Sequence, residues 1–245
     1  MHSNDSVLAA DLEVMARAHN YRNWMYRQIA PFIGQRVLEV GAGIGNVTEL
    51  LLDREVVVAT DKYQLMVDYL KRRWGAQLAV VPAQLDLGEP AAASLAHHEF
   101  DTVICMNVLE HVGDDLQALA YMHSVLAPGG RLILLVPAFQ FLYGTVDQAI
   151  GHYRRYTRKN LLPKLRESEF DVEQAFYMNV IGMAGWFWNN RILKTKEENS
   201  AQIGFFDRFI APWAERFEQI LRPPFGLSLI AIGRKRMIAS TNAAE

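Results

Sequence analysis

The chain has 245 residues, of which 51% are hydrophobic, with a formal net charge of -2 and a pI of about 6.4. This size can bury the core of one domain plus an elaboration, and the near-neutral charge argues against nucleic acid as a partner. The one cysteine, Cys105, cannot form an internal disulfide, which fits a reducing compartment. The N-terminus lacks a secretory pattern, and no stretch reaches the roughly 18 apolar residues of a membrane helix. We therefore expect a cytoplasmic protein without an integral membrane segment.

Short apolar runs alternate with helical patterns along most of the chain. The first 30 residues have the spacing of one or two amphipathic helices, with candidate inward positions at Leu8, Leu12, Met15, Trp24 and Ile29. The expected strands are 36–40, 56–60, 77–81, 100–106, 130–137, 170–178 and 226–235. The expected helices are 45–53, 62–74, 114–126 and 157–167, followed by an aromatic-rich helical stretch. Buried apolar strands separated by helices predict an α/β fold with a parallel sheet covered on both faces.

The segment "EVGAGIG" lies between an expected strand and an expected helix, where a nucleotide-binding loop belongs. Gly41 and Gly43 allow a sharp turn and a close approach of the backbone to a ligand. Asp61 ends the next strand, where a carboxylate can accept both hydroxyls of a ribose. A dinucleotide loop shares these features, but its third glycine would stand at Asn46, whereas the chain has Gly45. The spacing therefore disfavours a nicotinamide cofactor.

The spacing E-x-G-x-G-x-G from Glu39 resembles the first motif of the class I S-adenosylmethionine-dependent methyltransferases of the small-molecule type. The resemblance extends over roughly residues 20–140, through "YRNW", "QLDL", "FDTVICMNVLEHV" and "LAPGGRLILLVP". It implies S-adenosyl-L-methionine as cofactor and S-adenosyl-L-homocysteine as product. The cofactor-binding residues that it implies are Tyr21, Glu39, Gly41, Ala42, Gly43, Asn46, Asp61, Lys62, Asp86, Leu87 and Asn107.

The same resemblance implies a Rossmann-like sheet within a single domain over residues 1–245. Its parts are an N-terminal helical cover (1–30), a cofactor-binding core (31–140), a substrate loop with a helical cap (141–225) and a closing strand with a tail (226–245). The cap is expected because roughly 45 residues separate the last two strands, where the family usually has a short hairpin.

Simpler interpretations of these residues stay open. The glycines can serve a strand–helix turn alone, Asp61 can cap a helix, and Asp86 can be a solvated loop acid. Two other functions also stay open: a nicotinamide-dependent oxidoreductase, and a non-catalytic cofactor-binding partner protein with the same fold.

The end of the fourth expected strand indicates a small organic acceptor, such as a secondary-metabolite, lipid or glycan precursor. Enzymes that methylate the amino groups of nucleobases or glutamine often carry Asn/Asp-Pro-Pro-aromatic there, and this chain has "MNVLEH" instead. In the family His111 lies near the methyl-transfer centre, and imidazole titrates near neutral pH. His111 is therefore a candidate catalytic residue, or else a histidine that only packs at a helix start.

The loop "DQAIGHYRRYT" follows the fifth expected strand, whose carboxyl end should reach the ligand crevice. We expect His152 or Asp147 to act as a base, and Tyr153, Arg154 and Arg155 to bind the acceptor. The alternative is a structural cluster of ion pairs that fixes the loop. No metal site is predicted.

The stretch 176–194, with Trp213 and Phe217 after it, is rich in aromatic side chains. Tyr177 and Trp186 are candidates for an apolar acceptor pocket. The same stretch can instead form a homodimer face, touch lipid, or pack as the ordinary core of a lid.

Overall fold

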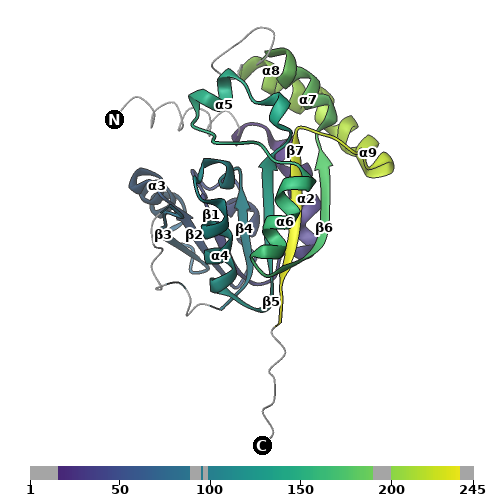
Figure 1. Cartoon of the computed structure of the whole chain (residues 1–245). Helices are drawn as coiled ribbons and strands as arrows, with labels where there is room; N and C mark the ends of the chain where they lie inside the picture. Colours follow the sequence, from purple (N-terminus) through teal and green to yellow (C-terminus); the bar gives the residue numbers. More distant parts are fainter. Residues whose placement is uncertain (1–15, 89–94, 96–98, 190–199, 238–245) are drawn as a thin grey trace, which may run out of the picture.

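The computed structural model describes residues 16–88, 95, 99–189 and 200–237. A seven-stranded sheet in the order β3-β2-β1-β4-β5-β7-β6 forms its centre (Figure 1). The strands are β1 (Arg36–Val40), β2 (Val56–Asp61), β3 (Val80–Gln84), β4 (Phe100–Met106), β5 (Leu126–Pro137), β6 (Phe170–Met178) and β7 (Ser228–Lys235). The α/β, Rossmann-like fold is confirmed.

The direction of the closing strand differs from that of the strands before it. β1 to β5 pair in parallel, whereas β7 runs antiparallel to both β5 and β6. The reason is the position of the cap. β6 leads to the carboxyl edge of the sheet, the cap lies there, and the chain returns from that edge into β7 (Figure 1).

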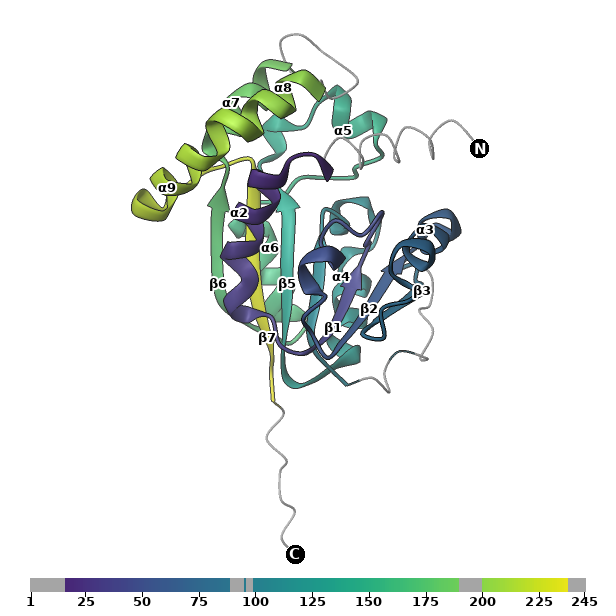
Figure 2. The ribbon, with the colours of Figure 1, turned by 180° about the vertical axis from the view of Figure 1, so that it is seen from behind.

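Helices cover both faces of the sheet and enclose two apolar cores. α4 (Asp115–Val125) and α6 (Arg158–Glu167) contribute to one core, with Leu119 and Leu161 fully buried. On the other face lie α2 (His19–Ile29) and α3 (Gln64–Trp74), which contribute Trp24 and Leu70 (Figure 2). Ala214 of α9 (Ala211–Leu221), a helix of the cap, joins the same core. The side chains of successive strand residues enter opposite cores, as the pleat requires.

Two predicted elements are placed differently in the structure. The expected helix 45–53 is only a 3₁₀ turn, η2 (Thr48–Leu51), because Gly45 has a φ of 85° and cannot continue a helix. The expected strand 77–81 begins three residues later as β3, because a turn closed by the N–H of Gln77 on Trp74 holds the chain beyond α3. Leu78 is consequently exposed.

The N-terminal helix α2 covers the sheet beside the cap. Trp24 and Ile29 are buried as predicted, while Leu8, Leu12 and Met15 fall outside the described residues. Nε of Arg27 donates to Oε1 of Glu215 on α9 at 2.7 Å, which fixes the cover to the cap.

The cap between β6 and β7 is helical, as predicted. It consists of α7 (Val180–Phe187), α8 (Ser200–Phe205), the π-helical η7 (Phe206–Ile210) and α9. Residues 176–178 of the aromatic-rich stretch belong to β6, which matches the expected strand 170–178. Among the described residues, no helix combines the length and apolar character needed to cross a bilayer.

Candidate functional site

The glycine loop after β1 has a conformation that its sequence requires. Gly41, Gly43 and Gly45 have φ values of 72°, 54° and 85°, a region that residues with a Cβ rarely adopt. A Cβ on Gly41 would also overlap Cγ2 of Val108, at the end of β4. The backbone therefore forms an open turn between the carboxyl ends of β1 and β4.

Asp61 fastens this loop to the end of β2. Its Oδ2 accepts a hydrogen bond from the N–H of Gly43 at 2.9 Å, and its Oδ1 accepts one from Tyr63 at 3.0 Å. The side chain is buried, and burial raises its pKa above the usual range, although these hydrogen bonds oppose the shift. Each oxygen keeps a lone pair for a further donor, so the carboxylate fits a ribose at this position.

Glu39 lies beneath the loop rather than beside it. It is buried, and its Oε2 accepts a hydrogen bond from the hydroxyl of Thr48 at 2.6 Å. Burial raises the pKa of Glu39 to about 7. The geometry supports a role in holding η2 against β1.

The other predicted cofactor residues surround the same edge of the sheet. Asn107 is exposed at the end of β4 with a φ of 52°, and Asp86 is exposed after β3 and accepts from the N–H of Gly88. Lys62 is exposed over the ring of Tyr63. The remaining four, which are buried or half-buried near this edge, are Tyr21, Ala42, Asn46 and Leu87.

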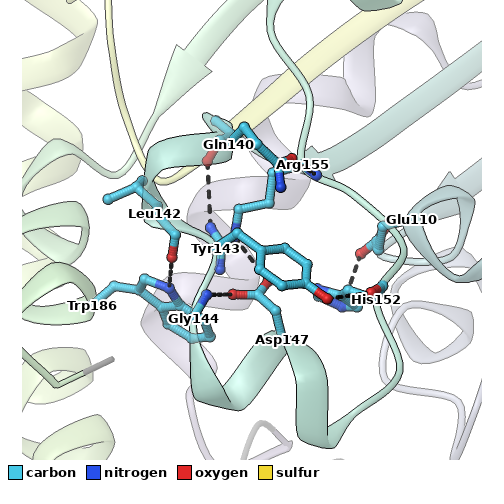
Figure 3. Close-up of polar contacts among 10 residues, drawn as sticks. Glu110, Gln140, Leu142, Tyr143, Gly144, Asp147, His152, Arg155 and Trp186 are labelled. Atoms are coloured by element: carbon cyan, nitrogen blue, oxygen red, sulfur yellow. Dashed lines mark hydrogen bonds and ion pairs between the residues drawn. The ribbon is translucent and has the colours of Figure 1, made fainter. Parts of the chain in front are cut away.

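A cluster of buried charged side chains lies beyond the end of β5, under α5 (Thr145–Ala149) (Figure 3). Oδ1 of Asp147 lies 2.7 Å from Nδ1 of His152 and accepts from Nε of Arg155 at 2.8 Å. Its Oδ2 accepts from the N–H of Gly144 at 2.9 Å. Burial alone would raise the pKa of Asp147, but the contacts with His152 and Arg155 hold it below the usual range. Asp147 is therefore a buried carboxylate that orients an imidazole.

Glu110 completes this cluster and was not predicted as a site residue. It is fully buried, its Oε1 lies 3.7 Å from Nε2 of His152, and neither oxygen has a hydrogen-bond partner among the described residues. Burial raises its pKa to about 8. The sequence signal was its position next to His111, and the contact with His152 depends on tertiary structure.

His111 faces His152 across the cluster, with ring centroids 4.5 Å apart in an edge-to-face arrangement. Burial, followed by the proximity of His152, lowers the pKa of His111 to about 4. Ligand atoms of Glu110, His111 and His152 lie within 4.8 Å of one another, so this group is able to hold a metal ion, which was not predicted.

The structure separates the predicted acceptor-binding residues. Tyr153 is exposed, and Nη1 of Arg154 lies 2.9 Å from Oδ2 of Asp115. Arg155 is buried, pairs with Asp147, and lies 4.7 Å from the ring centre of Trp186 on α7. Tyr177 is buried, and its ring stacks on Phe139. Of the five predicted residues, Tyr153 has the side chain most exposed to solvent. Arg155 instead holds the buried cluster together through its pair with Asp147.

Comparison with known proteins agrees with this geometry. Residues 38–132 match the family model of a methyltransferase domain. Demethylmenaquinone methyltransferase of Deinococcus radiodurans is 33% identical over 118 residues, which is 46% of this chain and 48% of that protein. Ubiquinone biosynthesis O-methyltransferase of Xanthomonas oryzae pv. oryzae is 27% identical over 174 residues, 64% of this chain and 70% of that protein. The chain spans less than half the length of the first curated relatives it matches.

A solved structure extends the likeness beyond the matched segment. The S-adenosylmethionine-dependent methyltransferase of Mesorhizobium loti superposes with a TM-score of 0.59 at 16% identity, covering 86% of this chain and 96% of that one. At this identity the likeness shows the fold alone. The family match over residues 38–132 and the shared fold agree with the predicted resemblance to the class I methyltransferases.

Proposed function

We propose that the protein transfers a methyl group from S-adenosyl-L-methionine to a small organic acceptor, a precursor of a secondary metabolite, lipid or glycan. The observation that carries the proposal is the glycine loop closed on Asp61, at the carboxyl ends of β1 and β2. A nicotinamide dinucleotide is disfavoured because Asn46 replaces the third glycine of its loop.

The cofactor would bind along the carboxyl ends of β1, β2 and β4. The open turn at Gly41 and Gly43 offers backbone groups to the methionine end, Asp61 accepts from the ribose, and the exposed Asp86 is available to the adenine amino group. When bound, the cofactor supplies an electrophilic methyl group for in-line attack by the acceptor. The protein contributes the alignment, from which much of the acceleration comes.

A base is needed if the acceptor is a hydroxyl that keeps its proton at working pH. We assign this role to His152, because Asp147 lies 2.7 Å from its Nδ1, and Nε2, at 3.7 Å from Oε1 of Glu110, is left as the nitrogen that accepts a proton. A carboxylate that orients an imidazole also stabilises the imidazolium that forms. His111 lies 4.5 Å away, and its low pKa keeps it neutral, so it would help to shape the site. The O-methyltransferase relative is consistent with an oxygen acceptor.

Calorimetric titration with S-adenosyl-L-methionine tests the cofactor part of the proposal. We expect the wild type to bind and Asp61→Ala to bind at least about tenfold more weakly, because charge-assisted hydrogen bonds to the ribose are lost. Asp53→Ala, on an exposed carboxylate that pairs with Arg54, is the matched control and should bind normally. No binding by the wild type, or equal binding by Asp61→Ala, contradicts the proposal.

The acceptor is sought by incubating the protein and methyl-labelled cofactor with a metabolite extract, followed by mass spectrometry of labelled products. A labelled small molecule supports methyl transfer. Cofactor binding without any labelled product over a broad set of extracts would favour a non-catalytic cofactor-binding protein.

A further inference from the structure

The cap presents an apolar stripe to the outside of the molecule. From Ser200 to Leu221 the chain is helical, as α8, η7 and α9 in succession. Every fourth residue of this helix from 205 to 221 is a large apolar side chain, and each is between 53% and 70% exposed. They are Phe205, Phe209, Trp213, Phe217 and Leu221. Ten of the sixteen large exposed apolar side chains of the described residues belong to the cap, far more than isolated surface residues explain.

The acids of this helix all face the protein. Asp207 accepts hydrogen bonds from the backbone of α2, including the N–H of Tyr21 at 2.8 Å. Glu215 pairs with Arg27 of α2. Glu218 accepts from the N–H groups of Asn179 and Val180, where α7 begins. All three are buried, so they anchor the helix and leave its outer face without negative charge.

The arginines of this helix and its C-cap face outward beside the apolar stripe. Arg208, Arg216 and Arg222 are exposed. The guanidinium of Arg208 lies 5.4 Å from the ring centre of Phe209, and that of Arg216 lies 5.6 Å from the ring centre of Trp213. No acidic residue is exposed within 180–189 and 200–227, the described part of the cap. Over these described residues, the outer face is thus apolar and aromatic, and its exposed charges are positive.

We propose that this face of the cap docks on a lipid surface that contains anionic headgroups. Aromatic and aliphatic side chains on one face, with cations able to reach headgroups, are the features of a helix that lies in the plane of a membrane interface. The described helices are unsuited to crossing a bilayer, which fits binding at the surface. A second copy of the chain fits less well, because a symmetric contact would bring six arginines together, and the described part of the cap offers no exposed acid to pair with them.

The position of the cap determines which side of the molecule would face the lipid surface. α7, α8 and α9 lie beyond the carboxyl ends of β5 and β6, on the side of the molecule that also carries α5 (Figures 1 and 2). Trp186 of α7 donates to the carbonyl of Leu142 and stacks against Arg155 of the buried cluster. If the proposed function holds, a docked cap places the site beside the lipid and favours an amphiphilic acceptor.

Sedimentation with vesicles tests the docking and does not depend on methyl transfer. The whole chain is mixed with vesicles of phosphatidylcholine alone, or of phosphatidylcholine with phosphatidylglycerol. We expect preferential binding to the anionic vesicles. The double variant Trp213→Ser/Phe217→Ser should bind at least about tenfold more weakly, because two apolar side chains no longer insert. Each of Arg208→Gln, Arg216→Gln and Arg222→Gln should weaken anionic binding by roughly fivefold.

Leu78→Ser is the matched control, since Leu78 is a fully exposed apolar residue far from the cap, and it should bind vesicles normally. Thermal unfolding monitored by circular dichroism checks that every variant folds. The proposal is overturned if folded wild type ignores both kinds of vesicle, or if the double variant binds as well as wild type. It is also overturned if light scattering shows that the wild type is a dimer and the double variant a monomer, because a second copy of the chain then covers the face. Calorimetric binding of S-adenosyl-L-methionine, measured separately, reports on the proposed function alone.

Discussion

The glycine loop and the buried charged cluster lie at the same edge of the sheet but are built by different means. The loop depends on backbone conformation, with positive φ at Gly41, Gly43 and Gly45 and backbone N–H groups bound to Asp61. The cluster depends on side chains from separate segments, with Glu110 after β4 and Asp147, His152 and Arg155 after β5. A backbone site leaves a spacing of glycines in the sequence, whereas a side-chain cluster leaves only its residue types.

The difference also predicts how each region responds to substitution. The loop should lose ligand affinity when a side chain enters it, with a modest effect on the fold. The cluster should lose catalysis or stability according to which member is removed, because buried charges depend on one another.

The largest effect is expected for His152→Ala. If His152 is the base for a hydroxyl acceptor, the rate of label transfer to product should fall by about 10²–10⁴-fold. Affinity for S-adenosyl-L-methionine, measured by calorimetry, should stay within about twofold, because the contacts of the imidazole are with Asp147, Glu110 and His111 of the cluster. Full turnover in both His152→Ala and His111→Ala would remove both from the list of bases.

Removal of metal distinguishes a base from a metal ligand at this position. Glu110, His111 and His152 are close enough to hold an ion, so a metal-dependent reaction would also fail in His152→Ala. With His152 as a base, wild-type turnover should be unchanged after treatment with a chelator. A loss that added Zn²⁺ or Mn²⁺ restores would contradict the base assignment.

Asp147→Ala should lower the free energy of unfolding by about 3–5 kcal/mol, because it leaves the buried guanidinium of Arg155 without its partner. Chemical denaturation monitored by circular dichroism measures this change. Glu173→Ala is the matched control. It breaks a pair with Arg131 that is partly exposed, and it should cost less than about 1 kcal/mol. Equal effects of the two variants would mean that the cluster contributes no more than a surface ion pair.

Gly41→Ala should weaken the binding of S-adenosyl-L-methionine by about 10- to 100-fold. The added Cβ combines a strained positive φ with an overlap on Val108, so the loop must shift. Gly129→Ala shares the positive φ of 76° but finds only ordinary contacts, the nearest at 3.6 Å from Nη2 of Arg234. Gly129→Ala therefore controls for the effect of backbone strain at a position outside the glycine loop. Calorimetry should show normal cofactor affinity for Gly129→Ala.

The smallest effect concerns pH. Because burial raises the pKa of Glu110 to about 8, the folded chain holds this proton after the unfolded chain has lost it. The stability that this group contributes is complete below the usual carboxyl pKa and declines as pH rises towards about 8. The wild type should therefore lose unfolding free energy between pH 5 and pH 9. Glu110→Gln should lose roughly 1–3 kcal/mol less over the same range. Glu39, with a pKa of about 7, should leave a residual slope at lower pH. If the unfolding free energies of wild type and Glu110→Gln changed in parallel with pH, the raised pKa of Glu110 would be contradicted.

Local patterns predicted most of the sheet, because buried parallel strands appear as short apolar runs between turns. The same patterns placed the helix after the glycine loop wrongly, since nothing in "NVTELL" shows that Gly45 takes a positive φ. The antiparallel direction of β7 follows from the hairpin that the resemblance implies for the last two strands, with the cap inserted in it, and not from local patterns.

The site residues also divide into those whose place the sequence predicts and those whose role depends on tertiary contacts. Asp61 was predictable because its place follows from strand order, and the structure puts it against the loop. Glu110 was missed because its importance comes from His152, 42 positions away in sequence. Arg155 was expected to bind the acceptor, yet it points inward, since sequence does not show that Asp147 is buried beside it.

Arg155 lies between two neighbours that belong to different parts of the molecule. On one side its Nε donates to the carboxylate that orients His152, and on the other its guanidinium faces the indole of Trp186 in the cap. Any displacement of α7 therefore changes the electrostatic surroundings of the imidazole. The same guanidinium thus contributes both to the seating of the cap and to the position of the carboxylate that holds His152.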